Sequence, residues 1–201
     1  QVLTVNEHEK LSPKTVEAMP ATGSYLDQLS DAIRHFVVNR DGLKTVIAGY
    51  PWFLDWGRDT LICTRGLIAA GFLQESEEII LQFGKYEEEG TLPNMICGGD
   101  ASNRDTTDAP LWYLTTCEDL MEVQGNHKLL TKKAGKRTVK EVLISLAENY
   151  INGTSNSIKM DESSGLIFSP SHFTWMDTNY PAGTPRTGFP IEIQSLWHKA
   201  L

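Results

Sequence analysis

The chain has 201 residues, 40% of them apolar, so it is long enough and apolar enough to fold around a hydrophobic core. Its 18 basic and 26 acidic residues give a net charge of −8, which disfavours nucleic acid and anionic membrane surfaces but is compatible with a neutral ligand such as a sugar. No apolar run could span a bilayer, and the unpaired spacing of Cys63, Cys97 and Cys117 indicates reduced thiols in a cytoplasmic protein.

The first elements in chain order are a lead-in and one helix. Residues 1–22 contain two prolines and no apolar period, so we expect an extended lead-in that carries little function. A helix is predicted to begin after Ser24 and to end at Asp41-Gly42. A short β-like stretch follows at 45–48. The apolar residues at helical spacing in this first helix are Leu26, Leu29, Ile33, Phe36 and Val37.

The rest of the chain is also predicted to be mainly helical. Between 156 and 173 the helical period is lost, and the apolar residues on both sides of 161–165 predict a small β-hairpin insertion. The acidic run 87–89 is expected to be a solvated helix end. Residues 23–201 are therefore expected to form one mainly α domain. Its further helices are predicted at 60–71, 74–88, 107–123 and 138–151, with a sixth helix beginning near Glu192.

Three long loops combine Trp, Arg and Asp, at 52–59, 103–112 and 174–192. Aromatic rings can pack on the apolar face of a sugar, and charged side chains can hydrogen-bond its hydroxyls. A single Arg–Asp pair has an ordinary structural explanation, but three such loops in one chain favour a sugar site. The candidate sugar-binding residues are Trp56, Arg58, Asp59, Arg104, Asp105, Asp108, Trp112, Trp175, Arg186 and Glu192.

Asp177 is the candidate catalytic acid. Glycoside hydrolysis needs one carboxyl group that donates a proton to the leaving oxygen and a second that acts as base or nucleophile. Asp177 follows Trp175, and packing against an indole would favour its protonated form. Aspartates that adjoin arginines, Asp59 among them, would stay ionised and suit hydroxyl binding. Glu192 is the second candidate acid, although its place at a helix start also fits a capping carboxylate.

Other chemistries lack their spacing in this sequence. The chain has no His-x-x-x-His or paired-Cys arrangement for a metal, no Gly-x-Ser-x-Gly elbow and no phosphate-binding glycine loop. Asp161-Glu162 comes nearest to a calcium loop but lacks the full pattern. We therefore predict no metal and no cofactor.

The motifs together resemble the carboxy-terminal amylo-α-1,6-glucosidase domain of glycogen debranching enzymes. The resemblance covers about residues 24–201. It implies an (α/α)6 toroid of helical hairpins, inversion at the anomeric carbon, and removal of the single α-1,6-linked glucose left at a trimmed branch of a glycogen-like α-glucan. The matching stretches are Ala48 to Thr60, Leu92 to Met95, Asn103 to Trp112, Thr174 to Asp177, Thr184 to Arg186 and Pro190 to Gln194.

The resemblance also implies roles for individual residues. Asp177 matches the acid in the family's Trp-Met-Asp motif, and Arg58 with Asp59 matches the pair that holds hydroxyls of the terminal glucose in the similar loop of glucoamylases. The chain matches about half of such a toroid, as its first half. The general base of these enzymes is expected beyond Leu201.

Two other interpretations remain open. The stretch Pro190 to Leu196 is also similar to a stretch of neutral and alkaline invertases, so a sucrose hydrolase of the same fold is one alternative. The Trp56 to Asp59 loop and the Thr184 to Arg186 motif favour debranching over this alternative. The other is a non-catalytic helical domain that binds glucan, which would keep the aromatic residues without needing Asp177.

Overall fold

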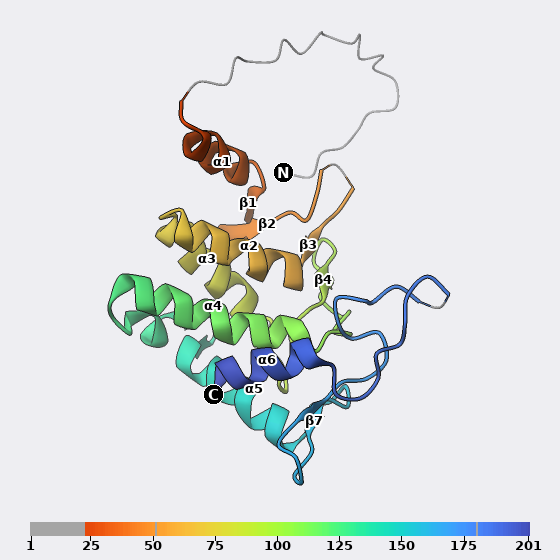
Figure 1. Ribbon diagram of the computed structural model, residues 1–201. Coiled ribbons are helices and arrows are strands. Elements are labelled where there is room, and N and C mark those ends of the chain that lie inside the picture. The colour runs from red at the N-terminus through yellow and green to blue at the C-terminus, as the bar shows by residue number, and fades with distance from the viewer. Residues whose placement is uncertain (1–22, 51, 180) are drawn as a thin grey trace.

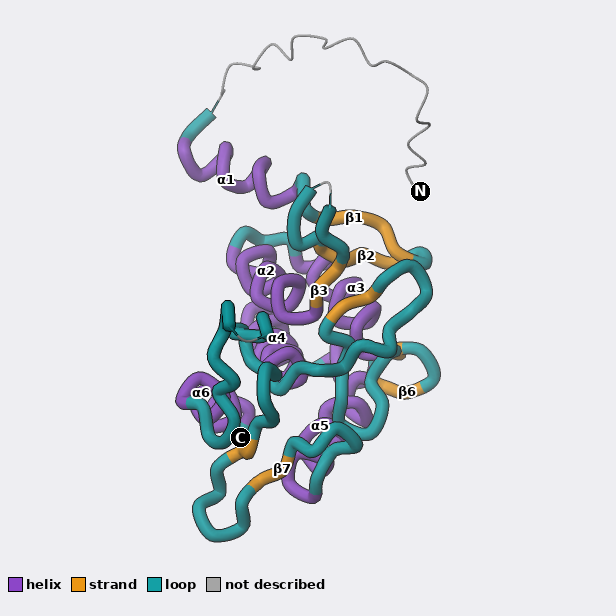
Figure 2. The backbone as a smooth tube through the Cα atoms, turned by 90° about the vertical axis from the view of Figure 1, so that its right-hand side faces the viewer, coloured by secondary structure: helices purple, strands orange, loops and turns teal. Residues whose placement is uncertain are grey.

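The computed structural model describes residues 23–50, 52–179 and 181–201, so the expected lead-in at 1–22 lies outside the described residues. The described residues form six α-helices, one 3-10 helix and four two-stranded sheets (Figures 1 and 2). The prediction of a mainly helical chain is confirmed. Within these residues no helix combines the length and the hydropathy that a membrane crossing requires.

The first helix is shorter than predicted. Helix α1 spans Tyr25–Arg34 and begins with a capping box, in which the Ser24 hydroxyl accepts from the backbone of Asp27. It is followed by a hairpin of strands β1, Val37–Arg40, and β2, Leu43–Val46. The predicted helical continuation was wrong, because Asp41 and Gly42 have φ angles of 49° and 83° and form the hairpin turn. The β-branched valines on either side of this turn favour strands.

Three helices lie side by side and begin at the same end of the molecule (Figure 1): α2 (Gly57–Ala69), α4 (Asp108–Gln124) and α6 (Ile191–Ala200). Helix α4 packs between α2 and α6, and helices α3 (Leu73–Gly84) and α5 (Val139–Asn152) pack against this row. The long loops gather at the end where α2, α4 and α6 begin, which faces the viewer in Figure 2.

Two apolar clusters hold these helices together. The larger lies among α2, α3, α4 and α5, and the predicted buried face of α5 contributes Val142 and Leu146 to it. In the smaller cluster, Tyr150 of α5 stacks on Trp197 of α6 with ring centroids 6.1 Å apart. Burying a large apolar side chain stabilises the fold by about 1.5–3 kcal/mol. The packing of such side chains, rather than helix propensity, therefore determines how the helices are arranged in space.

The remaining elements are short. The predicted hairpin around 161–165 is confirmed as strands β7, Lys159–Met160, and β8, Ile167–Phe168. Strand β3, Asp55–Trp56, pairs with β4, Met95–Ile96, and ties the first candidate sugar-binding loop to the segment that precedes the second. The others are the 3-10 helix η1, Lys128–Thr131, and strands β5, Lys133–Ala134, and β6, Arg137–Thr138.

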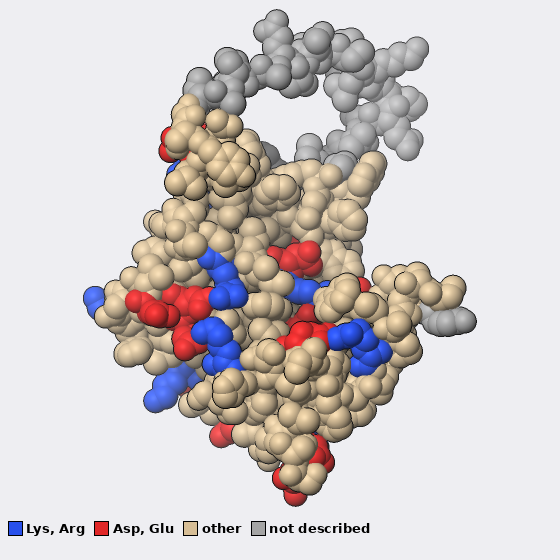
Figure 3. All heavy atoms as spheres, in the orientation of Figure 1, with Lys and Arg blue, Asp and Glu red and all other residues tan. Residues whose placement is uncertain are grey.

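Charges of both signs alternate on the face that carries α4 and α6 (Figure 3). Lys199 of α6 pairs with Glu118 of α4, and Arg65 of α2 pairs with Asp119 of α4. The acidic excess of the sequence is therefore not gathered into one patch on this face.

Candidate active site

The first turn of α2 is held tightly against the loop before β4. The backbone N–H of Gly57 donates to the carbonyl of Asn94 at 2.8 Å. A Cβ atom at Gly57 would overlap the carbonyl oxygen of Pro93 and would lie 3.3 Å from the Cβ of Ala109. Only glycine permits this approach, and the approach fixes where the next side chain, Arg58, emerges.

Gly57→Ala is expected to lower the free energy of unfolding by about 1–3 kcal/mol, because the obstructing atom belongs to the backbone and cannot turn away. Gly66→Ala, in the middle of the same helix, is the matched control. Its Cβ would meet only Ile33 at 3.4 Å, so helix propensity should stabilise this variant by about 0.5–1 kcal/mol. Urea unfolding of both variants checks the difference, and equal effects would contradict it.

Arg58 joins three elements of the site. Its Nε and Nη2 donate to the two carboxylate oxygens of Asp108 in α4, with Nη2 3.0 Å from Oδ1. Its Nη1 lies 3.3 Å from Oδ2 of Asp177 in the loop before α6. The side chain of Asp108 is almost fully buried and also accepts from the Thr106 hydroxyl at 2.7 Å. The side chain of Asp177 is 28% exposed.

The charge of Arg58 is set by these carboxylates. Burial acts to lower the pKa of Arg58, but the hydrogen bonds and charge of Asp108, followed by those of Asp177, outweigh burial and raise this pKa above its ordinary value. The guanidinium therefore stays charged. One positive charge faces two carboxyl groups, and Asp108 takes the two-point contact.

The segment that carries Asp177 is anchored on the start of α4. The backbone N–H of Thr107 donates to the carbonyl of Phe173 at 2.6 Å, and the hydroxyls of Thr107 and Ser169 lie 2.8 Å apart. The hydroxyl of Tyr150 in α5 donates to the carbonyl of Thr107 at 2.6 Å. These contacts bring Asp177 next to Arg58, which lies 119 positions earlier in the sequence.

Two hollows meet at Asp177. The smaller, of about 320 Å³, is lined by Ala48, Phe53, Trp56, Arg58, Asp59 and Asp177. The larger, of about 510 Å³, is also lined by Trp56 and Asp177, together with polar residues that include Asn94, Asn103, Asp105 and His172. Asp177 and Trp56 therefore line both hollows, which adjoin each other at these two residues.

The structure brings together six of the residues predicted for the site: Trp56, Arg58, Asp59, Asp105, Asp108 and Asp177. Asp108 is buried and reaches the site through Arg58, so its place is to hold the guanidinium rather than to meet a ligand. Asp59 and Asp105 are exposed at their hollows.

Trp175, Arg186 and Glu192 form a separate cluster. The Trp175 ring is 58% exposed and lies 6.0 Å from the guanidinium of Arg186, which pairs with Glu192. Trp175 lines neither hollow, and the tryptophan that lines both hollows with Asp177 is Trp56. Glu192 lies in the first turn of α6, where a carboxylate interacts favourably with the helix dipole, as the interpretation of a carboxylate at a helix start expects.

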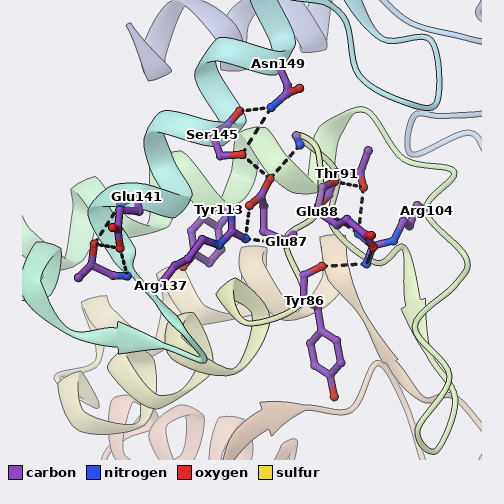
Figure 4. Close-up of polar contacts among 12 residues, drawn as sticks. Tyr86, Glu87, Glu88, Thr91, Arg104, Tyr113, Arg137, Glu141, Ser145 and Asn149 are labelled. Carbon is purple, nitrogen blue, oxygen red and sulfur yellow. Dashed lines mark hydrogen bonds and ion pairs between the residues drawn. The ribbon is translucent and has the colours of Figure 1, made fainter.

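Arg104 and Trp112 contact the scaffold and line neither of the two hollows. Arg104 donates to the Tyr86 carbonyl at 2.8 Å and to the Thr91 hydroxyl at 2.9 Å (Figure 4). Trp112 packs against the larger apolar cluster, with the guanidinium of Arg65 5.5 Å from its ring centroid. The sequence around Arg104 and Trp112 did not indicate these contacts.

The loop that Arg104 contacts is tied down by a buried acid. The side chain of Glu87 accepts from the backbone of Gly90 at 2.8 Å and from the Ser145 hydroxyl at 2.9 Å, and it pairs with Arg137 (Figure 4). The interpretation of run 87–89 as a solvated helix end was therefore wrong for Glu87, which joins the loop to α5.

Sequence reasoning missed Asn94 and His172, which line the larger hollow. Asn94 lies in the motif Leu92 to Met95, but its residue type alone indicated no role. Among the described residues, no three His, Cys, Asp or Glu side chains are placed to share a metal ion.

The site lies within a segment that matches a known family. A family model described as amylo-alpha-1,6-glucosidase matches residues 31–201, which is most of the chain and includes both hollows. The match agrees with the resemblance seen in the sequence motifs. The family is one of glycosidases related to glucan metabolism. The chain belongs to the amylo-alpha-1,6-glucosidase family.

Proposed function

We propose that this chain carries the catalytic acid and the glucose-binding residues of an enzyme that removes α-1,6-linked glucose from branch points of glycogen-like glucans. The observation that supports this most is the place of Asp177 on the boundary of two hollows, 3.3 Å from Arg58. A glycosidic bond held across that boundary has one sugar in each hollow and its bridging oxygen beside this carboxyl.

Asp108 and Asp177 contact Arg58 in different ways. Asp108 holds the guanidinium through two nitrogen atoms at a buried position. Asp177 makes one contact with it, 3.3 Å long, and its side chain is the more exposed of the two, so its carboxyl can reach a ligand. We therefore assign the role of acid to Asp177 and the role of holding Arg58 to Asp108.

The smaller hollow suits the glucose that is released. Trp56 and Phe53 offer aromatic faces to the ring, and Arg58 and Asp59 offer charge-assisted hydrogen bonds to its hydroxyls. This combination of an apolar wall and a few polar groups is typical of sugar-binding sites.

The proposal includes inversion within an (α/α)6 toroid. The row α2, α4 and α6, whose members begin at one end and are separated in the chain by α3 and α5, is the arrangement expected of the inner helices in half a toroid (Figure 1). An inverting enzyme places its second carboxyl roughly 6.5–9.5 Å from the acid, across the glucose.

The proposed partner is an α-glucan and the proposed location is the cytoplasm. Cys63, Cys97 and Cys117 are all free thiols, which supports a reducing compartment. Neither point depends on the assignment of Asp177.

The full-length protein is expected to release glucose from a branched α-limit dextrin and to leave sucrose intact. A glucose assay on both substrates checks this, with the same dextrin after complete debranching as the control substrate. Hydrolysis of sucrose would instead support the invertase-like alternative. Binding of dextrin without release of glucose would support a glucan-binding domain.

A further inference from the structure

The hydroxyl of Tyr150 is a buried polar group that takes no part in the proposed chemistry. Tyr150 lies on α5, its side chain is fully buried, and its ring stacks on Trp197 in the smaller apolar cluster. A phenylalanine would pack in the same way, so packing alone does not require the hydroxyl. Burial raises the pKa of Tyr150 well above its ordinary value, and the charge of Asp108 raises it further, so the hydroxyl keeps its proton and acts as a donor.

The acceptor of this hydroxyl is Thr107, which lies between the two carboxyl groups of the site. The hydroxyl of Tyr150 donates to the Thr107 carbonyl at 2.6 Å. The N–H of Thr107 donates at 2.6 Å to the carbonyl of Phe173, in the segment that leads to Asp177. Asp108 follows Thr107 directly in the chain. Thr107 therefore links both carboxyl groups that contact the guanidinium of the site.

The side chain of Thr107 also holds this junction instead of capping α4. Thr107 is the N-cap residue of α4, but its side chain makes no capping hydrogen bond, and the hydroxyl of Thr106 accepts from the backbone of Ala109 at 3.2 Å. The hydroxyl of Thr107 lies 2.8 Å from that of Ser169, whose backbone pairs with Gly188 in an antiparallel bridge. An N-cap hydroxyl usually accepts from its own helix, so this one is used to hold the loop that approaches the site.

We infer that Tyr150 is a positioning residue, whose hydroxyl fixes Thr107 and thereby the place of the Asp177 carboxyl beside Arg58. This rests on the proposed function, because it takes Asp177 as the acid. Tyr150 lines neither hollow, so it acts on the reaction only through Thr107. A general acid must lie within hydrogen-bond reach of the leaving oxygen, and a misplacement of about 1 Å can lower a rate by roughly 100-fold. A smaller shift of Thr107 is expected to lower kcat by about tenfold.

The test compares two buried tyrosines in the full-length protein. Tyr150→Phe removes the hydroxyl and keeps the stacked ring. Tyr113→Phe is the matched control, because Tyr113 is also fully buried and its hydroxyl also donates to a backbone carbonyl, that of Ile80 at 3.1 Å, but within the larger apolar cluster. The values measured for each variant are kcat and KM on branched limit dextrin and on α-glucosyl fluoride, together with Tm.

Tyr150→Phe is expected to lower kcat on dextrin by about tenfold, with KM changed by less than about twofold. Fluoride leaves without a proton, so the loss on the fluoride is expected to be less than about twofold. Tyr113→Phe is expected to lower Tm by a similar amount, because the same group is removed, and to change kcat on either substrate by less than about twofold.

Ser169→Ala is a second variant at the same junction, because it removes the partner of the Thr107 hydroxyl and leaves Tyr150 in place. It is expected to show the same selective loss on dextrin, and it tests the junction if Tyr150→Phe does not fold. Equal losses on dextrin and on the fluoride, or a kcat for Tyr150→Phe no lower than that for Tyr113→Phe, would overturn the inference.

Asp177→Asn separates failure of this inference from failure of the proposed function. A selective loss on dextrin in Asp177→Asn, with none in Tyr150→Phe or Ser169→Ala, would overturn the inference alone. If the unchanged protein released no glucose from limit dextrin, the proposed function and the inference would both fail.

Discussion

Asp177→Asn in the full-length protein is expected to lower the rate of glucose release from branched limit dextrin by about 10²–10⁴-fold, the usual contribution of a general acid. Asparagine keeps the size and polarity of the side chain, so the contact with Arg58 and the walls of both hollows should persist. The Kd for dextrin is therefore expected to change by less than about tenfold. Steady-state kinetics and calorimetry on the same preparation give the two values.

Glu192→Gln is the matched control for this prediction, because Glu192 is the other acid that the sequence offers. Its carboxylate pairs with Arg186 in a cluster apart from the two hollows, so its loss should reduce the rate by less than about tenfold. A larger loss for Glu192→Gln than for Asp177→Asn would move the acid to Glu192.

The largest expected effect on stability comes from Asp108→Ala. This change leaves the guanidinium of Arg58, which is 12% exposed, without the buried partner that it contacts through two nitrogen atoms. Removing one partner of a buried ion pair costs about 3–5 kcal/mol, and the single 3.3 Å contact with Asp177 would be all that remains for Arg58. Urea unfolding is expected to show a loss of this size. Asp108→Leu combined with Arg58→Met should lose less than the sum of the two single changes.

Asp119→Ala provides a control at a second Arg–Asp pair between the same two helices. Asp119 pairs with Nε of Arg65, so this pair also joins α2 to α4, but the Arg65 side chain is 39% exposed. Water can solvate that guanidinium once its partner is gone, so the expected loss is about 1 kcal/mol or less. Similar losses for Asp108→Ala and Asp119→Ala would mean that burial of Arg58 does not set the stability of the site.

Local signals predicted most of the helices. The Thr138 and Glu141 side chains form a capping box at the start of α5, and Gly71, just beyond α2, has a φ of 85°. The first helix was misjudged because Phe36 and Val37 continue its apolar spacing. The turn at 41–42 could equally end a helix or close a hairpin, and strand pairing decided between them.

The sequence grouped residues of three loops, some of which line the two hollows, but it did not show the contacts between them. Arg58 and Asp59 were grouped by motif and by resemblance, whereas the pairing of Arg58 with Asp108 spans 50 residues and depends on how α2 packs against α4. Residue type alone could not show that Trp112 faces the apolar cluster. The unpaired state of the Asn94 amide likewise becomes visible only once its surroundings are known.

Asp177 is proposed to give a proton to the departing sugar oxygen. The dependence of the rate on the leaving group tests this role most directly. We would measure kcat/KM of the unchanged protein and of Asp177→Asn on branched limit dextrin and on α-glucosyl fluoride. A sugar oxygen needs the proton to leave, whereas fluoride leaves readily without one. The expected loss is about 10²–10⁴-fold on dextrin and less than about tenfold on the fluoride. Equal losses on both substrates would contradict the role of Asp177 as the acid.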